Sequence, residues 1–370
     1  MDVTIRELRE ADIEAVNAFH NAQLGMSRTV EQFRWEFLDG PYGPSTYVVA
    51  EYDGEIVGTH ATLPVWLTRR GTRFLASKDE ETALAPQFRG RGIGARLFAA
   101  ASERAAVKGV KITFGIPNAP SLRSHVRTGH SYLGKATYGA LVWDAAQTSD
   151  LLYAHWKNQV FSRLTLALGP SVFRALCFGA KTASQTRRFA RTDSVAGLMV
   201  EAVQHVDRRL DTFASEFGQA YAAFTPLRSS EYLQWRLLDN PYSQAWLVLA
   251  LREGRVLAYA ALSLSRTRPY AELTDVCALP QYDGAASLAV QKAIDIAREC
   301  GAACIVAWSS MASSPQTRTI LNRLRSLGFV FPSLGSHLIA YETAEGDRTT
   351  SGFDEPRNWY VTLLLSQGVM

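Results

Sequence analysis

Runs rich in hydrophobic residues predict a pair of adjacent strands in each half of the chain. Residues 45–63 read STYVVAEYDGEIVGTHATL, and residues 244–262 read QAWLVLALREGRVLAYAAL. In each segment two strand-like runs flank a short turn, at Asp53-Gly54 in the first and at Glu253-Gly254 in the second. A residue pair that ends in glycine between two such runs is typical of a β-hairpin. We therefore expect one hairpin in each half.

The similarity between the halves extends beyond the hairpins. Residues 31–42 (EQFRWEFLDGPY) and 231–242 (EYLQWRLLDNPY) are identical at six of their twelve positions. After each hairpin the order is the same, with LAPQFRG (84–90) or ALPQYDG (278–284), then a helical pattern, then a strand pattern. Because a strand–helix–strand crossover makes its two strands parallel, each sheet is expected to be mixed. The chain is predicted to be a tandem duplication of an α/β unit, a partly parallel sheet flanked by helices.

The predicted division is a first domain over 1–145, a helical linker over 146–195, a second domain over 196–345 and a tail over 346–370 packed on one of the domains. With 370 residues, of which 47% are hydrophobic, each half is long enough to bury a core without disulfides or a structural metal. The four cysteines are few, and their spacing matches neither a disulfide framework nor a zinc ribbon. They indicate a reducing compartment.

Two features of the chain bear on its location. The first residues, MDVTIRELREAD (1–12), carry acids where a signal peptide has a basic and then an apolar stretch. Nowhere do about 18 apolar residues follow one another without a charge, as a membrane-spanning helix requires. We therefore expect a cytoplasmic protein.

The predicted linker is strongly basic although the whole chain has a net charge of only +4. Residues 151–192 contain seven Lys or Arg and no Asp or Glu, in a pattern that predicts two amphipathic helices broken near Gly169-Pro170. Four interpretations stay open: a solvated linker packed between domains, a surface for an anionic membrane, a docking site for an acidic acyl-carrier protein, or a cover over a phosphate-bearing ligand. Nucleic acid is not an expected partner, because no aromatic stacking platform accompanies the charge.

The two copies of the repeat differ in the segment before the helix. The first copy has a glycine-rich loop, Arg89-Gly90-Arg91-Gly92-Ile93-Gly94, where the second has Asp283-Gly284-Ala285-Ala286. Glycines let the backbone approach a ligand closely, and the amides of the first helical turn then point at a bound anion. In the second copy the carboxylate of Asp283 would cap the helix and repel phosphate. The loop predicts a phosphate site in the first copy only; a simple tight turn is the alternative.

The chain resembles the GNAT superfamily of acyl-CoA N-acyltransferases, whose signature is Arg/Gln-x-x-Gly-x-Gly/Ala. Arg89, Gly92 and Gly94 match this signature. The resemblance covers roughly residues 3–140, and residues of about 197–342 form a degenerate second copy without the signature. It implies two GNAT-like domains joined by the helical linker. It also implies that the donor acyl-CoA contacts one set of residues: Leu84, Ala85, Arg89, Gly90, Arg91, Gly92, Ile93, Gly94 and Asn118.

The resemblance also implies catalytic residues. Members often take the general base from the fourth strand, where this chain has Asp79, Glu80 and Glu81. Strand alternation predicts Asp79 and Glu81 on one face, and Glu81 is the first choice, with Asp79 as the alternative. His125 stands where the family commonly has the tyrosine that protonates the leaving thiolate; the alternative is an ordinary core or surface histidine.

The function implied by the resemblance is the transfer of an acyl group, most simply acetyl, from a CoA thioester to the amine of a small molecule. A weaker resemblance, through Trp35, Pro41 and Tyr42, is to bacterial tandem GNAT-like proteins that modify surface polysaccharides or amino sugars, so an amino sugar is the expected acceptor. No metal is expected. Two alternatives are a long-chain N-acyl amino acid synthase that uses acyl-CoA or an acyl-carrier protein, and a CoA-binding module without catalysis.

Overall fold

The computed structural model describes residues 2–151, 171, 174–183, 197–309, 315–331, 335–343 and 349–365. Of the basic segment 151–192, only residues 151, 171 and 174–183 are included, and 174–183 are helical. The predicted pair of linker helices and its possible partners therefore lie largely outside the described residues. Among the helices that are described, none is long and apolar enough to cross a membrane.

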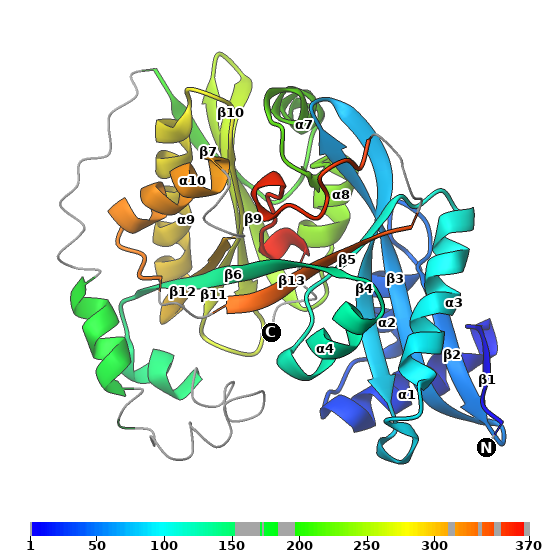
Figure 1. Cartoon of the computed structure of the whole chain (residues 1–370). Helices are drawn as coiled ribbons and strands as arrows, with labels where there is room; N and C mark the ends of the chain where they lie inside the picture. The colour runs from blue at the N-terminus through cyan, green and yellow to red at the C-terminus, as the bar shows by residue number, and fades with distance from the viewer. Residues whose placement is uncertain are drawn as a thin grey trace. The chain divides into compact units, whose positions relative to one another are not determined.

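The chain folds into two compact units (Figure 1). The first unit contains residues 1–134, 224–227 and 337–356, and the second contains residues 135–223, 228–336 and 357–370. Each unit thus includes segments from both halves of the sequence. The linear domain boundaries proposed above stay a prediction.

The first unit is a mixed sheet with helices on both faces. Its sheet has the strand order β1-β2-β3-β4-β5-β13, in which β4 and β5 are parallel and the other neighbours are antiparallel. The elements are β1 (Thr4–Glu7), η1 (Glu10–Asp12), α1 (Ile13–Leu24), α2 (Val30–Phe37), β2 (Thr46–Tyr52), β3 (Glu55–Arg69), β4 (Thr72–Leu84), η2 (Pro86–Phe88), α3 (Ile93–Val107), β5 (Ile112–Gly115), α4 (Ala119–Arg127), β8 (Thr225–Pro226) and β13 (Gly335–Glu342). The short strand β8 pairs with β3.

Strand alternation divides the core of the first unit into two layers. Val48 and Ala50 of β2 pack with Leu97 of α3 on one face of the sheet. Tyr47 and Val49, the alternate residues of β2, pack with α1 and α2 on the other face. The first face is called the α3 face below, and the second is called the α1/α2 face. Side chains two residues apart on a regular strand share a face, which is the basis of the prediction made for β4.

The second unit repeats this plan. Its sheet has the order β6-β12-β11-β10-β9-β7, with β11 and β12 parallel. Its elements are β6 (Ser131–Val142), β7 (Met199–Val203), α7 (Arg209–Ala220), α8 (Ser230–Leu233), the π-helical turn η3 (Gln234–Leu238), β9 (Ser243–Arg252), β10 (Arg255–Ser265), β11 (Ala271–Ala278), α9 (Asp283–Glu299), β12 (Cys304–Ser309), α10 (Pro315–Ser326), η4 (Pro356–Asn358) and η5 (Leu363–Leu365). The mixed α/β architecture and the duplication predicted from the sequence are confirmed.

Both predicted hairpins are present. Strands β2 and β3 pair antiparallel around Asp53-Gly54, and β9 and β10 pair around Glu253-Gly254. In each turn both residues have positive φ, 50° and 82° in the first and 52° and 77° in the second. This backbone matches the twist of the flanking strands, which is why a glycine follows the acidic residue in both copies.

Each sheet is completed by a strand from the other half of the sequence. Strand β6 follows α4 in the chain, but its residues from Thr137 to Val142 pair with β12 in the second unit. Strand β13 follows α10, but its residues from Ile339 to Glu342 pair with β5 in the first unit. The last strands of the two repeats are therefore exchanged.

A buried ion pair in the second unit gives a stability prediction. The Nε and Nη2 atoms of Arg228 donate to the carboxylate of Asp275 at 2.7 and 3.2 Å, and neither side chain is more than 1% exposed. Arg228→Met leaves a buried carboxylate without its guanidinium and should cost about 3–5 kcal/mol of unfolding free energy. The control Arg255→Met breaks an exposed pair with Glu216 and should cost at most about 1 kcal/mol. Urea unfolding of the full chain measures both, and equal losses would contradict the prediction.

Candidate functional site

The glycine-rich loop is an open turn at the amino end of α3. Gly90 and Gly92 have φ of 74° and 75°, and Gly92 is the N-cap residue of the helix. A Cβ atom added at either glycine would meet no other atom within 4 Å. The first turn of α3 contains no acidic residue, so its amides and the positive end of the helix dipole are offered to an anion.

Some side chains of the loop are exposed to solvent and others are buried. Arg89 and Arg91 are exposed, and the Nε of Arg89 donates to the carbonyl of Leu84 at 3.0 Å, which ties the loop to the end of β4. Ile93 is buried in the core of the first unit, so it can reach a ligand only through its backbone. Gly94 lies close to Leu84, because an added Cβ would come within 3.6 Å of that side chain.

Strand β4 extends beyond the end of β5, toward this loop. Their parallel pairing runs from Ala76↔Ile112 to Asp79↔Gly115, whereas β4 continues to Leu84. The edge of β4 beyond Asp79 is therefore not paired with β5, and an extended amide-containing ligand can add to such an edge. Asn118 is the N-cap residue of α4, and its Oδ1 accepts from the amide of Ser121 at 2.9 Å.

A β-bulge in β4 changes the direction of the acidic side chains. Thr59 of β3 pairs with Ala83 but Ala61 pairs with Glu80, so two residues of β4 lie opposite one residue of β3. Glu81 takes up the extra residue with φ of 50°, an unusual value for a residue other than glycine. The prediction that Asp79 and Glu81 share a face is therefore wrong. Asp79 lies on the α3 face, and Glu81 lies on the α1/α2 face.

Glu81 is held in a buried polar network. Arg28 binds both of its carboxylate oxygens, with Nη2 at 3.3 Å from Oε2 and Nη1 closer to Oε1. The hydroxyl of Tyr47 donates to Oε2 at 2.7 Å, and Nε2 of His20 lies 3.3 Å from the same oxygen. A second carboxylate, Glu36, lies 3.4 Å from Nη1 of Arg28.

Burial raises the pKa of Glu81, and Arg28 opposes this shift without cancelling it. The side chains of Arg28, Glu36 and Glu81 are at most 4% exposed. Two buried carboxylates therefore lie against one guanidinium, and the group carries a net negative charge when both are ionised. Uptake of a proton by one of the carboxylates relieves that charge.

The two copies show which part of this network is shared. In register with the repeat, Arg28 corresponds to Arg228 and Glu81 to Asp275, which form the buried pair described above. Glu36, in contrast, corresponds to Arg236. The arginine–carboxylate pair therefore belongs to the architecture of both copies, and the second carboxylate belongs to the first copy alone. Sequence reasoning missed Arg28, although Arg28-Thr29 and Arg228-Ser229 extend the repeat and Thr29 and Ser229 both cap a helix.

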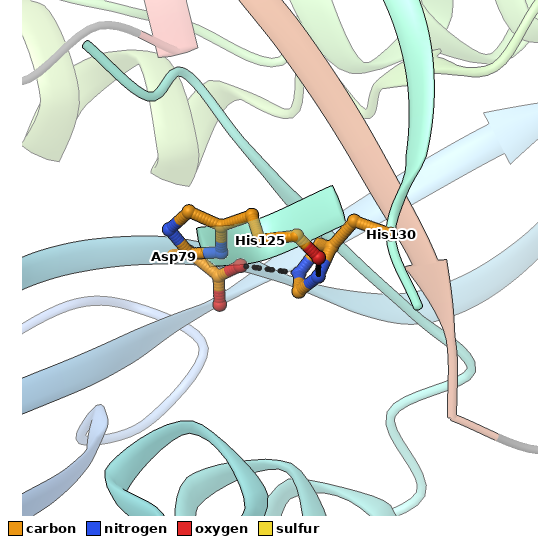
Figure 2. Close-up of side chains that lie close together, drawn as sticks. All are labelled: Asp79, His125 and His130. Carbon is orange, nitrogen blue, oxygen red and sulfur yellow. Dashed lines mark hydrogen bonds and ion pairs between the residues drawn. The ribbon is translucent and has the colours of Figure 1, made fainter. Parts of the chain in front are cut away.

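On the α3 face, three histidines surround Asp79. His130 Nε2 lies 3.3 Å from Asp79 Oδ2, and His60 Nε2 lies 3.5 Å from Oδ1 (Figure 2 shows Asp79, His125 and His130). Potential ligand atoms of Asp79, His125 and His130 all lie within 4.8 Å of one another. All four residues are buried, and the ring of Phe98 packs against the three imidazoles.

The electrostatics of this cluster follow from its burial. Burial alone would raise the pKa of Asp79, but the adjacent imidazoles of His130 and His60 lower it to about 2. Burial lowers the pKa of His125 to about 4. The structure thus places the two predicted catalytic residues Asp79 and His125 together, apart from Glu81. Sequence reasoning missed His60 and His130.

The second copy has no counterpart to this polar cluster. Asp79 pairs with Thr62 as Leu273 pairs with Leu262, so these positions are equivalent. The residues at the positions of His60, Asp79, His125 and His130 are Ala260, Leu273, Leu324 and Phe329, and all four are part of the hydrophobic core of the second unit. The fold itself therefore does not require an aspartate and three histidines here.

Two family models match the chain. Residues 4–125 match the model described as "Acetyltransferase (GNAT) domain", and residues 210–320 match the model described as "Acetyltransferase (GNAT) family". The search of curated proteins found no match.

Solved structures with the same fold cover nearly the whole chain. A GCN5-related N-acetyltransferase from Anabaena variabilis has a TM-score of 0.59 at 13% identity, over 93% of this chain and 73% of that one. A probable N-acyltransferase from Enterococcus faecalis has a TM-score of 0.61 at 10% identity, over 93% and 73%. A tandem GNAT protein from the clavulanic acid biosynthesis pathway has a TM-score of 0.55 at 14% identity, over 94% and 100%. At these identities the likeness concerns the fold alone.

Proposed function

Because the chain belongs to the GNAT superfamily and carries a GNAT domain in each half, we propose that its first unit is an N-acyltransferase. It moves an acyl group, most simply acetyl, from a CoA thioester to the amine of a small molecule. The observation that carries this proposal is the open loop at the amino end of α3, together with the end of β4 that extends beyond β5. The second copy lacks this loop.

The loop and the free edge of β4 bind the donor in this proposal. The amides from Gly90 to Gly94 hold the pyrophosphate, and the exposed Arg89 and Arg91 add positive charge. The pantetheine is peptide-like and extends along β4 past Leu84 and Ala85 toward Glu81. Asn118, the N-cap residue of α4 shortly after β5, also contacts the donor in this proposal.

Glu81 is the general base in this proposal. The acceptor amine approaches from the α1/α2 face, where Glu81 takes a proton from the ammonium group. The nitrogen then attacks the thioester carbonyl and the new C–N bond forms. The C–S bond breaks, and the second proton of the nitrogen passes to the departing thiolate, so that the products are the amide and CoA as its free thiol. Burial favours the protonated form of Glu81, which suits a group that must accept a proton.

Turnover assays test the proposal. The purified chain is incubated with acetyl-CoA and a panel of amines that begins with amino sugars and includes amino acids and polyamines. Release of the free thiol and the mass of the product are measured. We expect release of CoA together with an N-acetylated product for at least one amine.

The alternatives give different results in the same assay. Turnover with long-chain acyl-CoA but not acetyl-CoA would show that the acetyl group is the wrong donor and would favour an N-acyl amino acid synthase. Binding of CoA without turnover on any amine would favour a binding module.

A further inference from the structure

We propose that the buried cluster around Asp79 is a zinc site. Its ligands are Asp79, His125 and His130 (Figure 2), and His60 Nε2 lies 3.5 Å from the carboxylate of Asp79. The three ligands come from β4, from α4 and from the residue before β6, all within the first unit. This inference is independent of the proposed function, because no part of the donor loop or of the Glu81 network belongs to it.

The spacing of the ligand atoms fits a tetrahedral ion. Zinc–ligand bonds of about 2.0–2.1 Å place neighbouring ligand atoms about 3.3 Å apart at the corners of a tetrahedron. The Asp79 Oδ2 to His130 Nε2 distance is 3.3 Å, which equals this spacing. The ligand atom of His125 lies within 4.8 Å of those of Asp79 and His130.

The hydrogen bonds of His130 turn its lone pair toward Asp79. Its Nδ1 donates to the carbonyl oxygen of His125 at 2.9 Å, so in the neutral ring Nε2 carries no proton. That nitrogen then faces the carboxylate of Asp79, which is also only an acceptor. Two acceptors at 3.3 Å repel each other unless a positive ion lies between them. A zinc ion satisfies both.

Two further buried atoms support a ligand at this place. Asp79 Oδ1 and His60 Nε2 are both buried and have no hydrogen-bond partner. A buried polar atom without a partner costs about 1–3 kcal/mol. The two atoms lie 3.5 Å apart, and Oδ1 belongs to the carboxylate that also faces His130, so a cation held by this carboxylate would compensate for its missing partner.

The surroundings resemble the environment of known metal ligands. A metal-binding histidine usually uses its second nitrogen in a hydrogen bond that fixes the ring. Nδ1 of His130 bonds to the carbonyl of His125, and Nδ1 of His60 lies 2.7 Å from the hydroxyl of Thr82. Two imidazoles and one carboxylate, without a thiolate, suit zinc. The three ligands join β4 to α4 and to the residue before β6.

Metal analysis tests the site on the full chain. The protein is produced without a polyhistidine tag in zinc-supplemented medium, dialysed, and analysed by inductively coupled plasma mass spectrometry. We expect about one zinc ion per chain. Asp79→Asn and His130→Ala should each weaken zinc binding by more than about tenfold, since even outer-shell changes cost 10–100-fold. The control His205→Ala removes an exposed histidine and should leave the zinc content unchanged.

A second measurement does not depend on the folding of the variants. Removal of the metal from the wild-type chain with a chelator should lower its melting temperature, and zinc but not magnesium should restore it. Cobalt in the same site should give the strong visible absorption of tetrahedral coordination. A wild-type chain without bound zinc whose His130 is doubly protonated by nitrogen NMR would overturn the proposal, because a proton would then replace the metal. Full zinc content in Asp79→Asn would also overturn it.

Discussion

Glu81→Gln should lower kcat for acyl transfer by about 10²–10⁴-fold, the range expected when a general base is removed. Glutamine preserves the shape of the side chain and can still bond to Arg28 and Tyr47, so the network around it persists. It cannot accept the proton of the ammonium group. Steady-state assays with the best amine of the panel measure the effect, and circular dichroism and CoA calorimetry verify that the variant is folded and binds its donor.

Glu80→Gln is the matched control for this variant. Glu80 is the adjacent acid of β4, and its carboxylate pairs with Lys78 instead of joining the Arg28 network. Its replacement should leave kcat nearly unchanged. If Glu81→Gln retained wild-type turnover, the base would have to be sought elsewhere; if both variants lost activity equally, general disturbance of β4 would explain the loss better than a base at Glu81.

Gly92→Ala should weaken CoA binding by at least about tenfold, which corresponds to about 1.4 kcal/mol of binding free energy. The added Cβ meets no protein atom within 4 Å, so it extends into the open space at the mouth of the loop. There it keeps the pyrophosphate away from the amides of the first helical turn. Isothermal titration calorimetry with CoA measures the loss.

Gly109→Ala separates this effect from backbone strain. Gly109 follows the other end of α3, has φ of 87° and likewise has open space at its Cβ position. Alanine in the left-handed region costs about 1–2 kcal/mol of stability at either glycine. Only Gly92→Ala should lose affinity for CoA. Equal losses of affinity would mean that strain in α3 controls donor binding. If neither variant lost affinity, the loop would not be the donor site.

Local signals made much of the fold predictable. The hairpins at Asp53-Gly54 and Glu253-Gly254 depend on a few adjacent residues whose conformation the sequence strongly constrains. The parallel pairs β4–β5 and β11–β12 follow from the helix between their strands. The glycine-rich loop was likewise visible, because positive φ at Gly90 and Gly92 requires little beyond the residues themselves.

The candidate site was predicted less well because it depends on irregular and long-range structure. Glu81 adopts positive φ although it is not a glycine. No local sequence signal indicates the bulge that places its side chain on the face opposite Asp79. His60 and His130 meet Asp79 only in the folded sheet. Comparison of the two copies could have indicated these histidines, since Ala260 and Phe329 of the second copy occupy the positions of His60 and His130.

The exchange of the last strands also determines when the first unit can fold during synthesis. Strand β5 leaves the ribosome early, but its partner β13 ends at Glu342. At about 5–20 residues per second, translation from Gly115 to Glu342 takes roughly 10–45 s. Throughout that time the amino-terminal sheet has an open edge in the nascent chain. Tandem domains usually fold one after the other as they are synthesised. In this protein the first repeat cannot be completed before the second has been made.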